Sequence, residues 1–161
     1  MARSRIHHFE GFSIKRANVE IELDMTRLNN NLNNAQYKLD SAVMTSMEPF
    51  MPMDSGQFIA TTKAISAAEA GTGRVTAAAP PYGRYLYMGK VMVDSVTGKG
   101  PMVIPDGYGG ATLRFRKGAK LKATDRPLRY SRPGAKARWF EEAKKKDAKE
   151  WTKVVEEEIA K

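Results

Sequence analysis

Apolar residues recur at helical spacing in two stretches, one in each half of the chain. In the first, leucines, alanines and a valine fall on one side of residues 28–43, and asparagines fill the other. Asp24 or Thr26 can cap this helix at its start. We expect it to end near Met47, because Pro49 lacks an amide donor and disfavours helical geometry in the residue before it.

The second helical stretch runs from about Ala137 to the last residue of the sequence. Its apolar positions form a stripe along one side, made of Phe140, Ala143, Ala148, Trp151, Val155 and Ile159. Charged residues occupy the other positions, so the pattern is that of an amphipathic helix. We therefore predict that this helix docks on the rest of the protein through the stripe.

Three shorter patterns predict strands. Residues 19–23, VEIEL, alternate apolar and acidic side chains, which is typical of a short, half-buried strand. Residues 57–66 are rich in Ile, Thr and Phe and also favour a strand. Residues 74–79 can pair back across the turn marked by Gly71 and Gly73, so that these two segments are expected to form a hairpin.

The middle of the chain is interrupted by glycine and proline. Residues 82–88 follow two prolines and precede Gly89, so a short turn or helix is expected there. From residue 90 to residue 122, glycines and prolines separate short apolar runs, which predicts a long hairpin or loop.

Together these elements predict an α+β fold in one domain, residues 1–161. Its N-terminal helix and long C-terminal helix should pack on a small antiparallel sheet with extended hairpin loops. Residues 1–17 are expected to be a flexible N-terminal arm, and residues 90–136 an extended basic loop or hairpin region. The 161 residues, 42% of them hydrophobic, suffice for one sizeable core.

Composition excludes several classes of site. The sequence has no cysteine, so it can form neither a disulfide framework nor a thiolate metal site. No stretch approaches the ~20 apolar residues that a membrane span needs. The N-terminal residues also lack an apolar run of signal length. We therefore expect a soluble protein, made in a cytosol, with no membrane partner.

Positive charge is concentrated in one segment. The formal net charge is +9, and residues 112–138 contain a single acid, Asp125, among ten basic residues. These are Arg114, Arg116, Lys117, Lys120, Lys122, Arg126, Arg129, Arg132, Lys136 and Arg138. Residues 139–161 are nearly neutral, with six lysines and seven acids. Such local basicity is typical of an interface.

Candidate catalytic groups are scarce. His7 and His8 are the only histidines and lie in the terminal segment, so a serine, histidine and carboxylate triad is not expected. The loops AGTGRVT and TGKGP do not follow the phosphate-binding pattern and are explained as turns. We accordingly expect no enzyme activity, no cofactor, no metal site and no small-molecule substrate.

Aromatic residues interleave with the arginines of the basic segment. Single-stranded nucleic acid is often held by aromatic side chains set in a positive groove. The residues that fit this pattern are Tyr108, Phe115 and Tyr130 with Arg114, Arg116 and Arg129. The other interpretation, which we favour, is that the aromatics are core or interface residues and the cations meet acidic protein surfaces or tolerate nearby DNA.

Three segments carry a family resemblance. Residues 51–58 read MPMDSGQF, residues 79–92 read APPYGRYLYMGKVM, and residues 124–151 read TDRPLRYSRPGAKARWFEEAKKKDAKEW. In this order they resemble the P-x-x-[DT]-[ST]-G-x-L turn, the PYA-x-Y-x-Y-x-G element, and the closing proline-rich approach, R-W-F and long helix of tailed-phage minor capsid and neck proteins. Phe58 stands where that pattern usually has Leu, and Gly83 where Ala is common.

The resemblance implies a structural virion protein of the phage neck, a head-to-tail connector subunit that forms a ring around the DNA channel. Implied partners are other copies in the ring, neighbouring head-completion or portal-adaptor and tail-completion proteins, and viral double-stranded DNA, bound nonspecifically. Implied locations are the virion neck and, during assembly, the cytoplasm of the bacterial host. Two alternatives stay open: a basic nucleic-acid-binding module, and a tail-terminator or tail-completion subunit.

Two sets of residues are expected to serve this role. Contacts with a neighbouring subunit or the DNA channel are assigned to Arg114, Arg116, Lys117, Lys120, Arg126, Arg129, Arg132 and Lys136. Structural anchors are assigned to Tyr82, Tyr85, Trp139, Phe140 and Trp151. Residues 129–136 would then form a proline-stiffened, positively charged arm, with Trp139 and Phe140 at its root.

Overall fold

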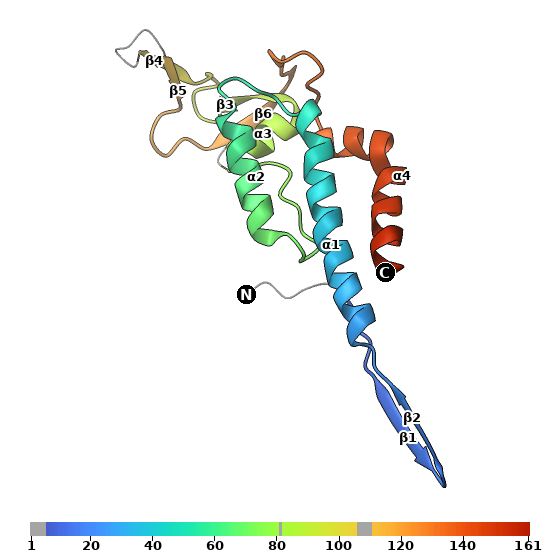
Figure 1. The fold of residues 1–161 in the computed structure, drawn as a ribbon. Coiled ribbons are helices and arrows are strands. Elements are labelled where there is room, and N and C mark those ends of the chain that lie inside the picture. Colours follow the sequence, from blue (N-terminus) through green and yellow to red (C-terminus); the bar gives the residue numbers. More distant parts are fainter. Residues whose placement is uncertain (1–5, 81, 106–110) are drawn as a thin grey trace.

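The computed structural model describes residues 6–80, 82–105 and 111–161 (Figure 1). Their elements, in chain order, are β1 Phe12–Arg16, β2 Val19–Leu23, α1 Thr26–Met47, the 3₁₀ turn η1 Glu48–Phe50, α2 Gln57–Glu69, α3 Gly83–Met88, β3 Lys90–Asp94, β4 Met102–Pro105, β5 Ala111–Arg114, β6 Leu121–Pro127 and α4 Trp139–Ile159. The expected α+β class is confirmed, with a long C-terminal helix packed on another helix. Within the described residues, no helix is both long enough and apolar enough to cross a bilayer.

Helix α1 lies between the two other long helices, with α4 on one side and α2 on the other (Figure 1). The buried core forms where α1 ends and α4 begins, around Met47, Met51, Trp139 and Ala143, each fully inaccessible to solvent. Burying one large apolar side chain contributes roughly 1.5–3 kcal/mol. The stripe predicted for α4 thus docks mainly against α1, with Ala143 and Trp151 among its buried residues.

The end of α1 follows the sequence prediction, whereas the N-cap residue is Met25 and not the predicted Asp24 or Thr26; Asp24 instead bonds the first residue of the helix. The carboxylate of Asp24 accepts hydrogen bonds from the backbone N–H and the hydroxyl of Thr26, at 2.8 and 2.6 Å. These bonds satisfy an amide that has no partner inside the helix. The helix ends at Met47 and continues as η1, whose second residue is Pro49.

The strand predicted over residues 57–66 is wrong, because this segment is helix α2. Its buried residues are Ile59, Thr62 and Ser66, spaced three and four apart. That spacing places them on one face of a helix, whereas a strand would send Ile59 and Thr62 to opposite faces. The strand preference of Ile and Thr is therefore overridden by burial against the rest of the fold.

The hairpin predicted with residues 74–79 is wrong as well, since this segment is not a strand. It is fixed by hydroxyl groups of α2 instead. The Ser66 hydroxyl donates to the carbonyl oxygen of Thr76 at 3.0 Å and accepts from its N–H at 2.9 Å. The Thr62 hydroxyl accepts from the N–H of Ala79 at 3.1 Å. Side chains thus satisfy backbone groups that a partner strand was expected to satisfy.

The described strands form three separate antiparallel pairs, β1 with β2, β3 with β6, and β4 with β5. The β3–β6 pair joins the body next to α3, which occupies the segment where a short helix was predicted. The β4–β5 pair projects from the end of the molecule where α1 ends, and β1–β2 projects from the opposite end of α1 (Figure 1).

The β1–β2 pair corrects two expectations. Strand β2 was predicted to be half-buried, yet all ten residues of the pair are exposed. Residues 12–16, expected to belong to a flexible arm, form strand β1. The segment that precedes β1 lies against α1. There the side-chain amide of Asn29 accepts a hydrogen bond from the N–H of Phe9 at 2.9 Å and donates one to its carbonyl at 2.8 Å.

Candidate functional site

The three segments that carry the family resemblance meet in space, at what we call the motif junction. The second and third segments are joined by a backbone hydrogen bond from the N–H of Arg138 to the carbonyl of Tyr87, at 2.8 Å. The N–H of Lys136 donates at 3.0 Å to the carbonyl of Phe50, the residue just before the first segment, and Phe58 of that segment contacts the ring of Trp139. The N–H of Leu128 also donates to the carbonyl of Gly89 at 2.8 Å. Segments separated by up to about a hundred residues thus form one unit.

Side chains of the residues before α4 complete the motif junction. The Tyr130 hydroxyl donates to the carbonyl of Leu86 at 2.6 Å, and burial raises the pKa of this phenol. The Arg132 guanidinium donates to the carbonyl of Glu48 at 3.0 Å. The segment 129–136, expected to form a positively charged arm, is therefore attached to the body through Tyr130, Arg132 and Lys136.

Trp139 is the central anchor of the motif junction. Its ring is completely buried and meets Tyr87 edge to face, with centroids 4.8 Å apart, and Phe58 in the same manner at 5.9 Å. The Tyr87 hydroxyl donates to Glu141 at 2.5 Å, and burial, together with that carboxylate, raises the pKa of the phenol. Edge-to-face pairs contribute about 0.5–1.5 kcal/mol beyond their buried area.

The other predicted anchors have different surroundings. Trp151 is buried, stacks on Phe140 at 6.2 Å and donates its indole N–H to the Ser46 hydroxyl at 3.1 Å. Tyr82 and Tyr85 do not enter the core. Tyr82 is 52% exposed, and both line a surface groove.

Three of the eight predicted contact residues are held by partners within the chain. Arg116 forms a two-point ion pair with Asp94, whose second contact is 3.2 Å long. The guanidinium, followed by the backbone N–H of Val96, lowers the pKa of the Asp94 carboxyl. Arg132 is bound to Glu48 as described, and the Lys136 ammonium lies 2.9 Å from Glu142. These three cations stabilise the fold rather than offer free charge.

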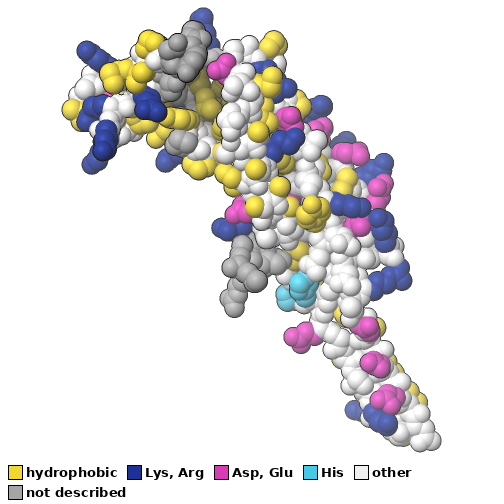
Figure 2. Space-filling model, turned by 60° about the vertical axis from the view of Figure 1, so that its left-hand side comes forward, with side chains coloured by type: hydrophobic (Ala, Val, Ile, Leu, Met, Phe, Trp, Pro, Cys, Tyr) yellow, Lys and Arg dark blue, Asp and Glu magenta, His cyan; other side chains and the backbone are white. Residues whose placement is uncertain are grey.

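The other five predicted contact residues are exposed and make no hydrogen bond or ion pair with a described side chain. They are Arg114, Lys117, Lys120, Arg126 and Arg129. They belong to strands β5 and β6 and the segments beside them, and with Lys122 they form what we call the basic end. Figure 2 shows Lys and Arg side chains gathered with apolar surface at the upper left of the molecule, away from the β1–β2 hairpin at the lower right.

The aromatic residues of this segment do not form one exposed stacking platform. The hydroxyl of Tyr130 is bound within the motif junction, and Phe115 is partly buried and lines the groove. Tyr108 lies outside the described residues. At the two aromatic positions that the structure describes, Phe115 and Tyr130, the ring therefore packs within the chain and is not offered to a nucleic acid base.

The groove is lined mainly by α3 and β3, with single residues from neighbouring segments, and has a volume of about 440 Å³. We call it the apolar groove. Its lining residues are mostly apolar, with one carboxylate and one ammonium: Asp54, Tyr82, Tyr85, Leu86, Lys90, Val91, Met92, Pro101, Phe115 and Leu128. A groove of this kind fits apolar side chains of another segment or another molecule.

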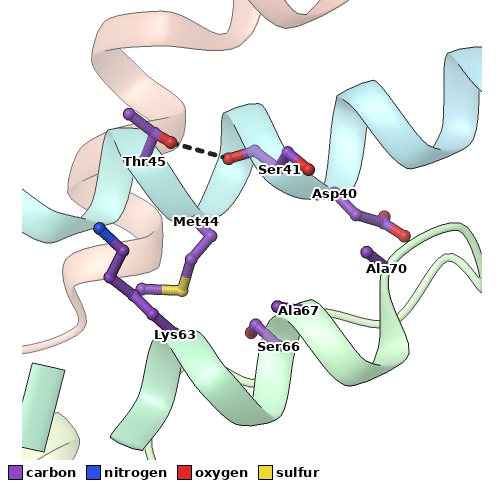
Figure 3. A pocket seen from close by; sticks show the side chains of 8 residues that line it. All are labelled: Asp40, Ser41, Met44, Thr45, Lys63, Ser66, Ala67 and Ala70. Atoms are coloured by element: carbon purple, nitrogen blue, oxygen red, sulfur yellow. Dashed lines mark hydrogen bonds between the residues drawn. The ribbon is translucent and has the colours of Figure 1, made fainter. Parts of the chain in front are cut away.

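A smaller cavity of about 200 Å³ lies between α1 and α2 (Figure 3). Its polar groups are already engaged. The buried carboxylate of Asp40 accepts from the Gln36 amide at 2.7 Å and from the backbone N–H groups of Gly71 and Gly73 at 2.8 and 3.2 Å. Lys63 pairs with Glu48 at 2.9 Å. This cavity is explained as packing between two helices.

The β1–β2 hairpin is a surface that sequence reasoning missed. Directly opposed residues of an antiparallel pair lie on the same face. The register therefore places five apolar side chains on one face, in the pairs Phe12 with Leu23 and Ile14 with Ile21, and Val19, which is opposite Arg16 next to the turn. Ser13, Glu22, Lys15 and Glu20 form the other face. The alternation of apolar and polar residues in FSIKR and VEIEL was the available signal. The error was to assume that the rest of the chain would cover the apolar face.

Among residues 6–80, 82–105 and 111–161, no three His, Cys, Asp or Glu side chains are grouped closely enough to hold a metal ion. Of the two histidines, His8 contacts the amide of Asn33 at 2.9 Å and His7 packs edge to face against Phe9. No family model, no curated protein and no solved structure matches this chain.

Proposed function

We propose that this chain is a structural subunit of the neck that joins the capsid and tail of a tailed phage, assembled as a ring around the DNA channel. The observation that carries the proposal is the position of its unpartnered surfaces. Apolar side chains are exposed on two hairpins at opposite ends of one helical body, for example Ile21 at 55% and Val103 at 64% (Figure 1). A ring requires two different, complementary faces on each subunit.

The motif junction supports the same proposal. The segments that resemble neck proteins are not scattered over the surface; they pack around Trp139, and the second and third are also joined by backbone hydrogen bonds. Residues that act together as one structural unit are constrained together by the fold. The resemblance therefore concerns an architecture rather than three independent turns, which makes chance similarity a weaker explanation.

The basic end supports contact with DNA or with an acidic neighbour. Arg114, Lys117 and Arg126 are exposed cations without described acidic partners. A subunit that surrounds a DNA passage needs weak, sliding contacts, and nonspecific affinities of about 10⁻⁴ to 10⁻⁶ M at physiological salt fit that need. A nucleic-acid-binding module is the second candidate, favoured by the same exposed cations.

Localisation in assembled particles tests the proposal. The chain would carry a small epitope after Lys161 and be produced together with the portal, capsid and tail genes of its own genome. Electron microscopy of purified particles with an antibody against the epitope should show label at the vertex where the tail joins. Label on the shell or along the tail, or its absence from particles that package DNA, would refute the neck position.

The second candidate is tested on the purified protein. Fluorescence anisotropy with labelled duplex and single-stranded DNA, repeated over a salt series, measures affinity and its salt slope. A dedicated nucleic-acid binder should bind far more tightly than about 10⁻⁶ M at physiological salt. Weak binding with no preference for sequence or strandedness agrees with the neck proposal and rejects the dedicated module.

A further inference from the structure

The apolar face of the β1–β2 hairpin is exposed among the residues that the structure describes. Phe12, Ile14, Ile21 and Leu23 are exposed by 50, 51, 55 and 42%. Within residues 6–80, 82–105 and 111–161, no helix or loop covers this pair, which projects beyond the start of α1 (Figure 1). An apolar face on a projecting two-stranded ribbon is uncommon in a monomer and marks a contact site.

The hairpin also needs this contact for its own stability. A two-stranded ribbon without a third strand or a helix packed on it is marginally stable in water at best. The one ion pair across the strands, Lys15 with Glu20 at 3.1 Å, lies on the exposed polar face and contributes about 0–1 kcal/mol. Burial of the apolar face is therefore the main available source of stability for this element.

The apolar groove at the other end of the molecule has the complementary chemistry. It is bordered mainly by α3 and strand β3, and its apolar lining includes Tyr82, Tyr85, Met92 and Leu128. Tyr82 is 52% exposed, so the groove presents an aromatic side chain to an incoming segment. Its volume of about 440 Å³ accommodates several aliphatic side chains from a ribbon edge.

Charge favours the same pairing. Residues 10–24, which contain the hairpin, carry four acids and two bases, namely Glu10, Glu20, Glu22 and Asp24 against Lys15 and Arg16. The groove adjoins the basic end, where exposed cations predominate. Glu20 and Glu22 project from the polar face, so they act through the net negative charge of the segment and not by direct contact. That net charge is attracted to the basic side chains beside the groove, whereas two hairpins would repel weakly.

From these observations we infer that the β1–β2 hairpin of one copy docks its apolar face into the apolar groove of the next copy. The two surfaces lie at opposite ends of one chain, so they cannot meet within a molecule (Figure 1). Such a head-to-tail contact is heterologous and closes into a ring if the rotation between copies allows it. The inference rests on the proposed function in that it specifies the contact between ring subunits.

Disulfide trapping tests this contact, because the chain has no cysteine of its own. One protein carries Ile21→Cys on the apolar face, and a second, longer by a tag, carries Tyr82→Cys in the groove. The two are mixed and mildly oxidised, and products are separated by mass. The matched control replaces Ile21→Cys with Glu22→Cys, the next residue on the polar face.

The expected result is a mixed dimer of Ile21→Cys with Tyr82→Cys, several-fold more abundant than the mixed dimer of the Glu22→Cys control. It should decrease as salt is raised, because the surrounding charges are exposed and screened. Dimers of Ile21→Cys with itself would show hairpin-to-hairpin pairing, and no cross-link above the control would show that the hairpin binds a different protein. Either outcome overturns the inference.

A charge in the apolar face provides a second test. Ile21→Glu should abolish self-association measured by mass photometry, while the folded body, which does not contact the hairpin tip, keeps its near-ultraviolet tryptophan signal. The matched variant Glu22→Gln should associate normally. Unchanged association of Ile21→Glu, with the fold intact, would overturn the inference.

Failure of this inference and failure of the proposed function give different results. If the chain is labelled at the neck vertex but no mixed disulfide forms, the function stands and the ring uses other faces. If the mixed disulfide forms but no particle carries the chain at its neck, head-to-tail self-assembly stands and the assignment to the neck falls.

Discussion

The indole N–H of Trp139 donates a 2.8 Å hydrogen bond to the carbonyl oxygen of Ala77, 62 residues earlier in the chain. Trp139 is the first residue of α4, and Ala77 belongs to the extended segment held by the hydroxyls of α2. This bond therefore connects the start of the C-terminal helix to the far side of the core. It explains why the motif junction is a single unit with one buried ring at its centre.

Replacing this anchor should be severe. Trp139→Ala removes a fully buried ring and its hydrogen bond, and substitutions of this kind cost about 3–5 kcal/mol. Urea unfolding followed by circular dichroism measures the change. The control is Tyr37→Ala, an aromatic residue of α1 that is 57% exposed, which should change stability by about 0.5 kcal/mol or less.

Asp40, the one carboxylate of α1, should be sensitive to substitution. Asp40→Ala leaves the N–H groups of Gly71 and Gly73 without their acceptor, and an unsatisfied buried donor costs about 1–3 kcal/mol. We expect a lower urea midpoint and faster amide exchange at residues 71–73. Glu150→Ala, at an exposed position of α4, is the matched control, and an equal loss in both variants would contradict this account.

Two glycines with similar backbone angles should respond differently to alanine. Gly89 has φ 63° and Gly98 has φ 68°, so each substitution carries the left-handed cost of about 1–2 kcal/mol. A Cβ at Gly89 would lie 2.5 Å from the Cβ of Ala137. A Cβ at Gly98 would meet no described heavy atom within 4 Å beyond its neighbours in the chain. Gly89→Ala should therefore lower the melting temperature clearly more than Gly98→Ala; equal losses would show that the packing of α3 on Ala137 is not tight.

Stability should fall in acid partly through Glu142. Hydrogen bonds from Lys145 and then Lys136 lower the pKa of this carboxyl from 4.5 to about 2. Because the folded pKa is the lower one, the ionised group stabilises the fold above pH 4.5, and this contribution is lost as pH falls toward 2. Glu142→Gln should show a smaller drop in urea midpoint between pH 6 and pH 3 than the parent protein. Glu150→Gln should retain the full drop.

Arginines of the basic segment should separate into two groups. Arg114→Ala removes an exposed cation and should weaken nonspecific DNA binding, with the salt slope reduced by about one if that residue contacts a phosphate. Arg116→Ala should instead destabilise the β3–β6 region, because Asp94 loses its partner while its carboxylate stays buried. Anisotropy and thermal unfolding on both variants check the distinction. Identical effects on DNA binding with no difference in stability would contradict it.

The long helices could be predicted from sequence because their signals are local and repeated. Helix α1 begins beside Asp24 and ends at Met47, and α4 begins at Trp139, two residues after the expected start. Helix α2 was missed because its identity depends on what covers it. Its buried positions, Ile59, Thr62 and Ser66, include two hydroxyl residues whose partners lie in a segment with no regular structure of its own.

The basic segment shows a similar limit. Charge and its location along the chain were evident from the sequence, but the sequence could not tell which cations have intramolecular partners. Arg116 and Arg114 are two residues apart, yet one pairs with a buried aspartate that precedes it by 22 residues and the other is exposed. Which side chains form ion pairs across such separations is decided by the fold. Only the structure could therefore separate the predicted contact residues into paired and exposed cations.

Helix α1 joins the hairpin to the core without a break. Its 22 residues span about 33 Å, with the β1–β2 ribbon before Thr26 and the buried Met47 at its last turn. A tensile force applied to the ribbon is therefore carried along the helix axis and shared with the neighbouring α4. Under tension the exposed ribbon should therefore unfold before the helical body to which α1 connects it.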